Sequence, residues 1–130
     1  MIVLDASAAL DWLLQTPVGQ RIETRIFSRH ESLHAPHLLD LEVAQVLRRL
    51  VRENVIPPPR ADQALDDLRD LRLSRYPHFV LIPRIWQLRH NLSAYDAAYV
   101  TLAETLDAPL LTRDARLASA PGQTAQIEVF

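Results

Sequence analysis

The sequence lacks cysteine and lysine altogether and holds only two glycines in 130 residues. Without cysteine there is no disulfide, thiolate metal site or thiol nucleophile. Without lysine there is no lysine general base, and two isolated glycines cannot form a phosphate-binding loop. No apolar run approaches the ~18 residues that a membrane-spanning helix needs. Strand-like residues begin at Ile2, which leaves no room for a signal peptide, so we expect a cytoplasmic protein with no membrane contact.

The charge balance excludes a general DNA-binding protein. All 14 basic residues are arginine, and 16 acidic residues outnumber them, which gives a net charge of −2. General DNA binders carry a basic excess instead. Hydrophobic residues make up 48% of the chain and charged residues 23%, which is typical of a folded globular protein. A chain of this length predicts one domain over residues 1–130.

Hydrophobic spacing predicts strands that alternate with helices. We expect strands at 2–4, 33–35, 78–82, 110–112 and 126–130, and helices at 8–14, 17–28, 37–52, 61–73, 84–90, 94–106 and 114–119. Ser7 and Ser93 are the expected caps of the helices that follow them. This order predicts an α/β fold, a three-layer α/β/α sandwich with a short, mainly parallel central sheet and helices on both faces.

Four acidic residues occupy positions that favour a shared pocket. Asp5 ends the first strand and Asp114 follows the strand at 110–112, so both point to the same rim of a parallel sheet. Asp96 continues the apolar stripe of its helix, and Glu42 lies at the edge of another such stripe. Carboxylates that converge in a pocket repel one another unless a proton or a cation relieves the repulsion. Mg²⁺ or Mn²⁺, which prefer oxygen ligands, fit such a pocket best.

The same acids are also compatible with a purely structural role or with a different chemistry. The helix dipole alone favours Asp96 at a helix start, and Asp114 is a suitable helix cap. A phosphatase of the haloacid-dehalogenase type needs Asp-x-Asp at the first strand, and Ser7 in place of the second acid argues against it. A non-catalytic interaction module, whose acids only bind a partner or bridge a dimer, remains an alternative.

Four segments carry a resemblance to a known family. They are residues 1–8 (MIVLDASA), 41–43 (LEV), 91–99 (NLSAYDAAY) and 110–114 (LLTRD). In this order and at these spacings they resemble the PIN domain and, within it, the VapC-type toxins of bacterial toxin–antitoxin pairs. The resemblance implies a PIN-like fold and an Mg²⁺- or Mn²⁺-dependent endoribonuclease. Its metal-binding and catalytic positions match Asp5, Glu42, Asp96 and Asp114.

On this resemblance each residue receives an expected role in the hydrolysis of an RNA phosphodiester. We expect Asp5 and Asp96 to bind the metal directly and Asp114 to complete the site, partly through water. Glu42 would hold a second ion or orient the nucleophile. Ser7 and Thr112 would supply hydroxyls that fix these carboxylates.

The resemblance also implies partners. Structured RNA such as tRNA is the expected substrate, with Arg113, Arg89 and Arg49 as candidate RNA-binding residues, although exposed arginines are common on any surface. A homodimer is expected, held inactive by a VapB-type antitoxin whose tail enters the acidic groove. DNA would be reached only through that antitoxin. An RNA-processing nuclease outside a toxin–antitoxin pair is the alternative.

Overall fold

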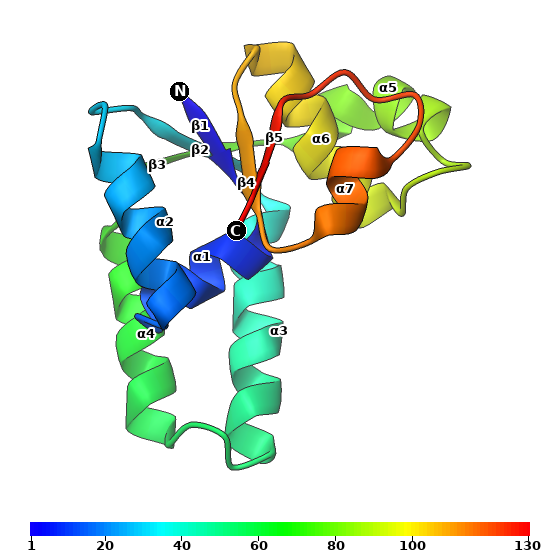
Figure 1. Cartoon of the computed structure of the whole chain (residues 1–130). Coiled ribbons are helices and arrows are strands. Elements are labelled where there is room, and N and C mark those ends of the chain that lie inside the picture. The colour runs from blue at the N-terminus through cyan, green and yellow to red at the C-terminus, as the bar shows by residue number, and fades with distance from the viewer.

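A computed structural model describes residues 1–130, with a five-stranded, fully parallel sheet at its centre (Figure 1). The strands are β1 (Ile2–Leu4), β2 (Leu33–Pro36), β3 (Leu73–Tyr76), β4 (Leu110–Thr112) and β5 (Ile127–Val129), in the order β3-β2-β1-β4-β5. Val3 of β1 lies opposite His34 on one side and Leu110 on the other. The continuous apolar run of β1 is typical of a parallel strand that is buried on both faces.

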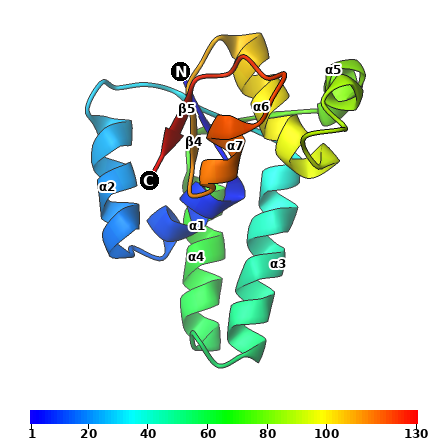
Figure 2. The ribbon, with the colours of Figure 1, turned by 45° about the vertical axis from the view of Figure 1, so that its right-hand side comes forward.

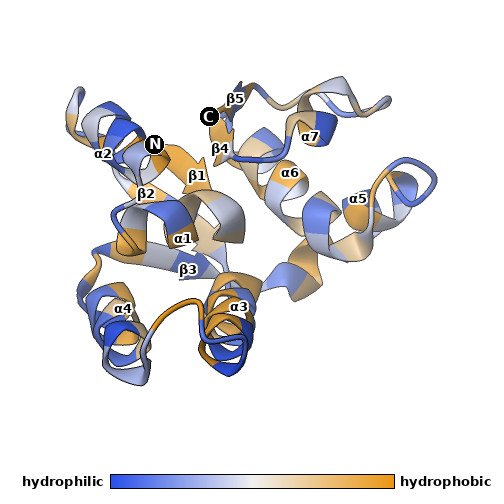
Figure 3. Ribbon diagram, turned by 60° about the horizontal axis from the view of Figure 1, so that its bottom comes forward, coloured by the Kyte–Doolittle hydropathy of each residue, from blue (hydrophilic) through white to orange (hydrophobic).

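Helices cover both faces of the sheet. They are α1 (Ala6–Leu13), α2 (Pro17–Phe27), α3 (Leu38–Arg52), α4 (Pro58–Asp70), the 3₁₀ helix η1 (His78–Leu81), α5 (Ile82–Gln87), α6 (Ala94–Leu106) and α7 (Ala115–Ser119). Val3 packs in a core with residues of α3 and α6, whereas Ile2 and Leu4 pack with Ile22 and Ile26 of α2. Figure 3 shows the apolar strands β1 and β4 between α2 and α6. The predicted three-layer α/β/α architecture is therefore confirmed.

Helices α3 and α4 form a hairpin that extends away from the sheet (Figures 1 and 2). The buried face of α3 is formed by Leu39, Val43 and Leu47. In the connecting turn, Asn54 has a φ of 57°, and the proline run that follows begins α4. Proline suits the first turn of a helix because its nitrogen needs no hydrogen-bond partner there. None of the helices combines the length and apolar character needed to cross a bilayer.

The third strand is not where the sequence predicts it. The expected strand at 78–82 is η1 and the start of α5, and the actual strand, β3, lies at Leu73–Tyr76. The helix expected to reach residue 73 accordingly ends at Asp70. β3 is an edge strand with only half-buried or exposed residues, so it lacks the apolar run that marks a central strand.

The start of α1 also differs from the prediction. Asp5, not Ser7, caps this helix, because its side chain accepts a hydrogen bond from the backbone N–H of Ala8. The helix therefore begins at Ala6. Ser93 caps α6 as predicted, since its hydroxyl accepts from the backbone N–H of Asp96.

Candidate active site

Asp5 is buried at the carboxyl end of β1, with 7% of its surface exposed. One carboxylate oxygen accepts hydrogen bonds from the Ser7 hydroxyl at 2.6 Å and from the Ala8 N–H at 2.9 Å. The other oxygen accepts a hydrogen bond from the Thr112 hydroxyl. Burial raises the pKa of Asp5, and these three hydrogen bonds oppose the rise. A carboxylate this buried remains costly to ionise unless further positive charge approaches it.

The hydroxyls of Ser7 and Thr112 tie the β1–α1 junction to the end of β4. The Thr112 oxygen, which is fully buried, also accepts from the backbone N–H of Asp114 at 2.9 Å. The Ser7 oxygen accepts from the backbone N–H of Arg113 at 2.9 Å. Each hydroxyl therefore donates to Asp5 and accepts from the loop that follows β4. The two side chains hold the Asp5 carboxylate in one orientation.

Glu42 reaches the same region from α3 and is held by Tyr99 of α6. The Tyr99 hydroxyl donates a hydrogen bond of 2.6 Å to Glu42 Oε1, and the Tyr99 side chain is buried. Burial raises the pKa of Glu42, the Tyr99 hydrogen bond lowers it, and the negative charges of Asp5 and Asp96 add to the rise. The sequence indicates the apolar stripe on which Tyr99 lies. It does not reveal the hydrogen bond to Glu42, a residue 57 positions away.

Asp96 stands in the first turn of α6, where Ser93 fixes its backbone. Its negative charge raises the pKa of both Asp5 and Glu42, so the three carboxylates share one electrostatic environment. Ion pairs in the protein involve other acids, and none of these three has a basic group within 4.0 Å. Asp5, Glu42 and Asp96 are hereafter called the acidic trio.

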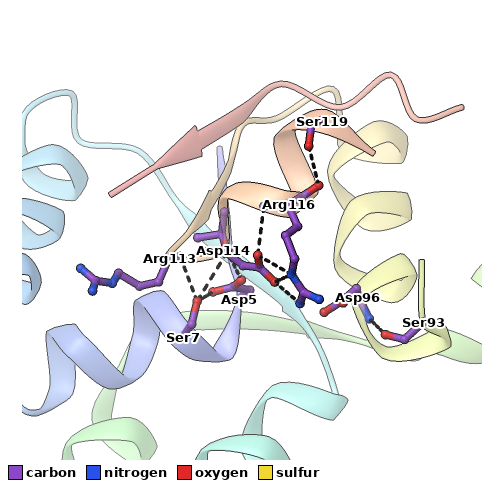
Figure 4. Close-up of polar contacts among 9 residues, drawn as sticks. Asp5, Ser7, Ser93, Asp96, Arg113, Asp114, Arg116 and Ser119 are labelled. Atoms are coloured by element: carbon purple, nitrogen blue, oxygen red, sulfur yellow. Dashed lines mark hydrogen bonds and ion pairs between the residues drawn. The ribbon is translucent and has the colours of Figure 1, made fainter. Parts of the chain in front are cut away.

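Asp114 is oriented differently from the trio. It caps α7 by accepting from the backbone N–H of Arg116 at 3.0 Å, so the interpretation of this residue as a helix cap is correct. The Arg116 guanidinium also binds both of its carboxylate oxygens (Figure 4). These hydrogen bonds lower the pKa of Asp114. No three carboxylate or imidazole side chains converge into a closed ligand set. Asp114 thus borders the trio through Thr112 while its charge is matched by Arg116.

The three candidate RNA-binding arginines differ in their relation to the trio. Arg49 lines a groove of about 520 Å³ together with Ser7 and Glu42, and pairs with Glu53, the residue that caps the end of α3. Arg113 follows Thr112 directly, and its side chain pairs with Asp11 at 3.2 Å. Arg89 follows α5 and stacks on the Trp86 ring at 4.8 Å. Arg49 and Arg113 therefore border the acidic region, whereas no contact links Arg89 to it.

The donor set of the acidic trio fits a hard divalent cation. Its carboxylates, with the hydroxyls beside them, are oxygen ligands of the kind that Mg²⁺ and Mn²⁺ prefer. Hydrogen-bond donors hold Asp5 and Glu42, but no basic group lies within 4.0 Å of the trio, and burial raises the pKa of two of its members. A cation there would relieve the mutual repulsion. Asp5, Glu42 and Asp96 are thus the residues whose side chains would have to close around a metal ion, because the three do not form a closed ligand set by themselves. Asp114 would join them only if Arg116 released it.

Comparison with known proteins gives closely related sequences and a common fold. The profile of the family described as "PIN domain" matches residues 2–123. Ribonuclease VapC1 of Mycobacterium tuberculosis is 47% identical over 128 residues, covering 98% of this chain and 96% of that protein. VapC ribonuclease Mb0985 of Mycobacterium bovis is 49% identical over 117 residues, covering 90% and 88%. The crystal structure of VapBC2 from Rickettsia felis, bound to a DNA fragment of its promoter, has a TM-score of 0.72 at 13% identity, covering 99% of this chain and 98% of that one.

Proposed function

From the premise that this chain belongs to the PIN-domain family and to its VapC ribonucleases, we propose that it is an Mg²⁺- or Mn²⁺-dependent endoribonuclease. It acts as the toxin of a VapBC-type toxin–antitoxin pair. The observation that carries the metal dependence is the acidic trio, three carboxylates around a buried strand end with no basic partner. In a non-catalytic module, nothing would offset the destabilising repulsion among these three carboxylates.

The proposed reaction is the hydrolysis of an RNA phosphodiester. A divalent cation bound by the trio supplies the chemistry, because it acidifies water and offsets the charge that develops on the phosphate. Asp5 and Asp96 are its direct ligands in this proposal. Ser7 and Thr112 keep the Asp5 carboxylate oriented by their hydrogen bonds, and Tyr99 does the same for Glu42. Glu42 then holds a second ion or orients the attacking water.

The proposed substrate is structured RNA such as tRNA. Since the trio is negatively charged, the RNA backbone must be held by cations at its border, where Arg49 and Arg113 lie. Both are also paired with an acid, Arg49 with Glu53 and Arg113 with Asp11. The Arg49 guanidinium can exchange Glu53 for a phosphate, because exposed ion pairs contribute little stability. The Arg113 pair is partly buried, since only 22% of the Asp11 side chain is exposed.

The proposed partners are a VapB-type antitoxin and a second copy of this chain. The acidic trio suits a basic antitoxin tail, which would lie along the groove that Ser7, Glu42 and Arg49 line, and DNA would be contacted by the antitoxin alone. An exposed apolar patch supports the dimer. It combines residues of η1 and α5 with one residue at the start of α6, namely Phe79, Val80, Ile82, Trp86 and Tyr95. Patches of this kind commonly mark protein–protein interfaces.

The proposed function is tested with the Asp5→Asn variant. The asparagine oxygen can still cap α1, so the fold is retained, but the negative charge required for metal binding is lost. We expect unfractionated tRNA to be cut by the wild-type protein only when Mg²⁺ or Mn²⁺ is added, and not by Asp5→Asn under any metal concentration. Asp62→Asn, an exposed acid on α4, is the control and should leave the rate unchanged. Full activity of Asp5→Asn would refute the assignment.

The alternatives give different results. A non-catalytic module would leave tRNA intact in a complete metal titration of the wild-type protein. An RNA-processing nuclease outside a toxin–antitoxin pair would cut RNA but would have no small antitoxin gene directly upstream. Mapping the 5′ ends of cellular RNA after induction of the wild type and of Asp96→Asn identifies the cleavage sites that depend on the trio.

A further inference from the structure

We propose that Arg116 is an exchangeable counterion of the active site. In the metal-free protein its guanidinium neutralises Asp114. When a divalent cation takes that carboxylate, the guanidinium is released to bind an RNA phosphate. The inference rests on the proposed function, and it gives Arg116 a substrate-binding role that no motif of the sequence indicates.

Arg116 occupies both oxygens of Asp114. Its Nε lies 3.0 Å from Oδ1 and 3.2 Å from Oδ2, and its Nη2 lies 2.5 Å from Oδ2. The capping bond from its backbone N–H uses the same carboxylate. With both oxygens engaged, Asp114 is a poor ligand until the guanidinium leaves. This explains why Asp114 does not join the acidic trio although Thr112 links it to Asp5.

Nothing else holds the Arg116 side chain. Its hydrogen bonds are all to Asp114, and 82% of the side chain is exposed. Arg84 is a useful contrast, because only 33% of its side chain is exposed. Two of its nitrogens donate hydrogen bonds to the well-buried Glu104, and it also donates to the carbonyl of Gly122. Exposed ion pairs contribute little net stability. The Arg116 pair can therefore exchange, whereas the Arg84 pair is structural.

The position of Arg116 makes the released guanidinium useful. It reaches from α7 over Asp114, with Asp96 of α6 beyond it (Figure 4), and the charge of Asp96 acts on it. It thus stands between two predicted metal ligands. Once displaced, it stays tethered two residues from Asp114, at the border where RNA must approach. Its planar fork of N–H donors suits the two oxygens of a phosphate.

The exchange predicts that one substitution, Arg116→Ala, strengthens metal binding and weakens RNA binding. Arg116→Ala removes a competitor for Asp114, so the dissociation constant for Mn²⁺ should fall about two- to fivefold, the effect of one exposed ion pair. The same variant loses a phosphate contact. The KM for tRNA should rise about tenfold at saturating Mg²⁺, and the slope of log(kcat/KM) against log[salt] should become shallower by about 0.7–0.9. A merely structural role would weaken both metal and RNA binding.

The experiment compares four full-length proteins: wild type, Arg116→Ala, Arg116→Lys and Arg69→Ala. Mn²⁺ binding is measured directly by calorimetry without RNA, and tRNA cleavage is measured separately. Arg69 is the matched control, because its side chain is also 82% exposed and lies near an acid of its own helix, Asp66. Lysine keeps the charge but cannot bind both oxygens, so it should fall between arginine and alanine. The backbone cap of α7 is unchanged in every variant.

The outcomes separate the inference from the proposed function. Tighter Mn²⁺ binding and a higher KM in Arg116→Ala, with Arg69→Ala unchanged, support the exchange. Unchanged or weaker Mn²⁺ binding in Arg116→Ala overturns it, while wild-type cleavage that depends on Asp5 leaves the proposed function intact. A wild-type protein that binds no Mn²⁺ overturns both.

Discussion

At the scale of single residues, Tyr99 is the side chain on which we expect the chemistry of Glu42 to depend. Its hydroxyl is the only side-chain hydrogen-bond partner of that carboxylate. In Tyr99→Phe the ring still packs in the core, but Glu42 loses the hydrogen bond that lowers its pKa. We expect a tenfold or larger loss in kcat and weaker Mn²⁺ binding, measured by tRNA cleavage and calorimetry. Tyr95→Phe is the matched control, since Tyr95 is exposed on the same helix.

The pH dependence of this variant gives an independent readout. Burial raises the pKa of Glu42 above its ordinary 4.5, so protons compete with the metal at a higher pH than they would at an exposed carboxylate. Without Tyr99 the pKa rises further, and Mn²⁺ binding should be lost at a higher pH than in the wild type. In the metal-free protein, the pKa of Glu42 is higher in the folded state than in the unfolded state. Between these two pKa values, the folded state binds more protons than the unfolded state. Stability therefore falls as the pH rises through that window. An unchanged pH profile in Tyr99→Phe would contradict this role.

The sequence predicts the position of each acidic residue better than it predicts its contacts. Strand ends and helical spacing indicate where Asp5, Glu42 and Asp96 lie, because these follow from local periodicity. The Tyr99–Glu42 bond joins two helices far apart in the chain, and no local pattern encodes it. The ion pair of Arg116 with Asp114 joins residues that are close in the sequence. It nevertheless depends on side-chain rotamers, which the spacing of residues does not determine.

At the scale of elements, β3 and η1 show where the hydrophobic pattern of the sequence predicts the wrong secondary structure. Residues 78–82 are the more apolar segment, yet Phe79 and Val80 lie exposed on η1. The true strand, β3, pairs with β2 through four residues and carries Arg75, whose guanidinium binds Asp40. An edge strand needs one neighbour and tolerates polar side chains, so its pattern is weak. The central strands β1 and β4 are predicted correctly because burial on both faces requires a largely apolar run, broken in β4 only by Thr112.

The contact between α1 and α2 depends on the absence of a side chain at Gly19. A Cβ atom there would lie 1.9 Å from the carbonyl oxygen of Asp11. Gly19→Ala should therefore push α2 away from α1 and lower the free energy of unfolding by about 3 kcal/mol, the upper end of overpacking costs. Urea denaturation measures this loss. Gln20→Ala, exposed on the same helix, is the control. Alanine is the better helix former by about 1 kcal/mol, so a stabilised Gly19→Ala would show that the contact is unimportant.

At the scale of the whole molecule, the apolar patch on η1 and α5 is the proposed dimer surface. Phe79 is its most exposed member, at 81%. A charge in a buried interface is costly, so Phe79→Asp should convert the dimer to a monomer of 14.8 kDa in analytical ultracentrifugation. Val55→Asp changes another exposed hydrophobic residue, in the α3–α4 turn, and should leave the dimer intact. A wild-type monomer, or a dimeric Phe79→Asp, would contradict the proposed interface.

The strand order has a consequence for how the protein is made. β1 is synthesised first but lies in the middle of the sheet, and its neighbour β4 comes from residues 110–112. Until the ribosome has translated Thr112, Asp5 lacks both its adjoining strand and the hydroxyl that orients it. A polypeptide that terminates before Thr112 therefore has no oriented Asp5 carboxylate and should lack the proposed ribonuclease activity. The proposed activity thus waits on a strand that leaves the ribosome more than 100 residues after the strand with which it pairs.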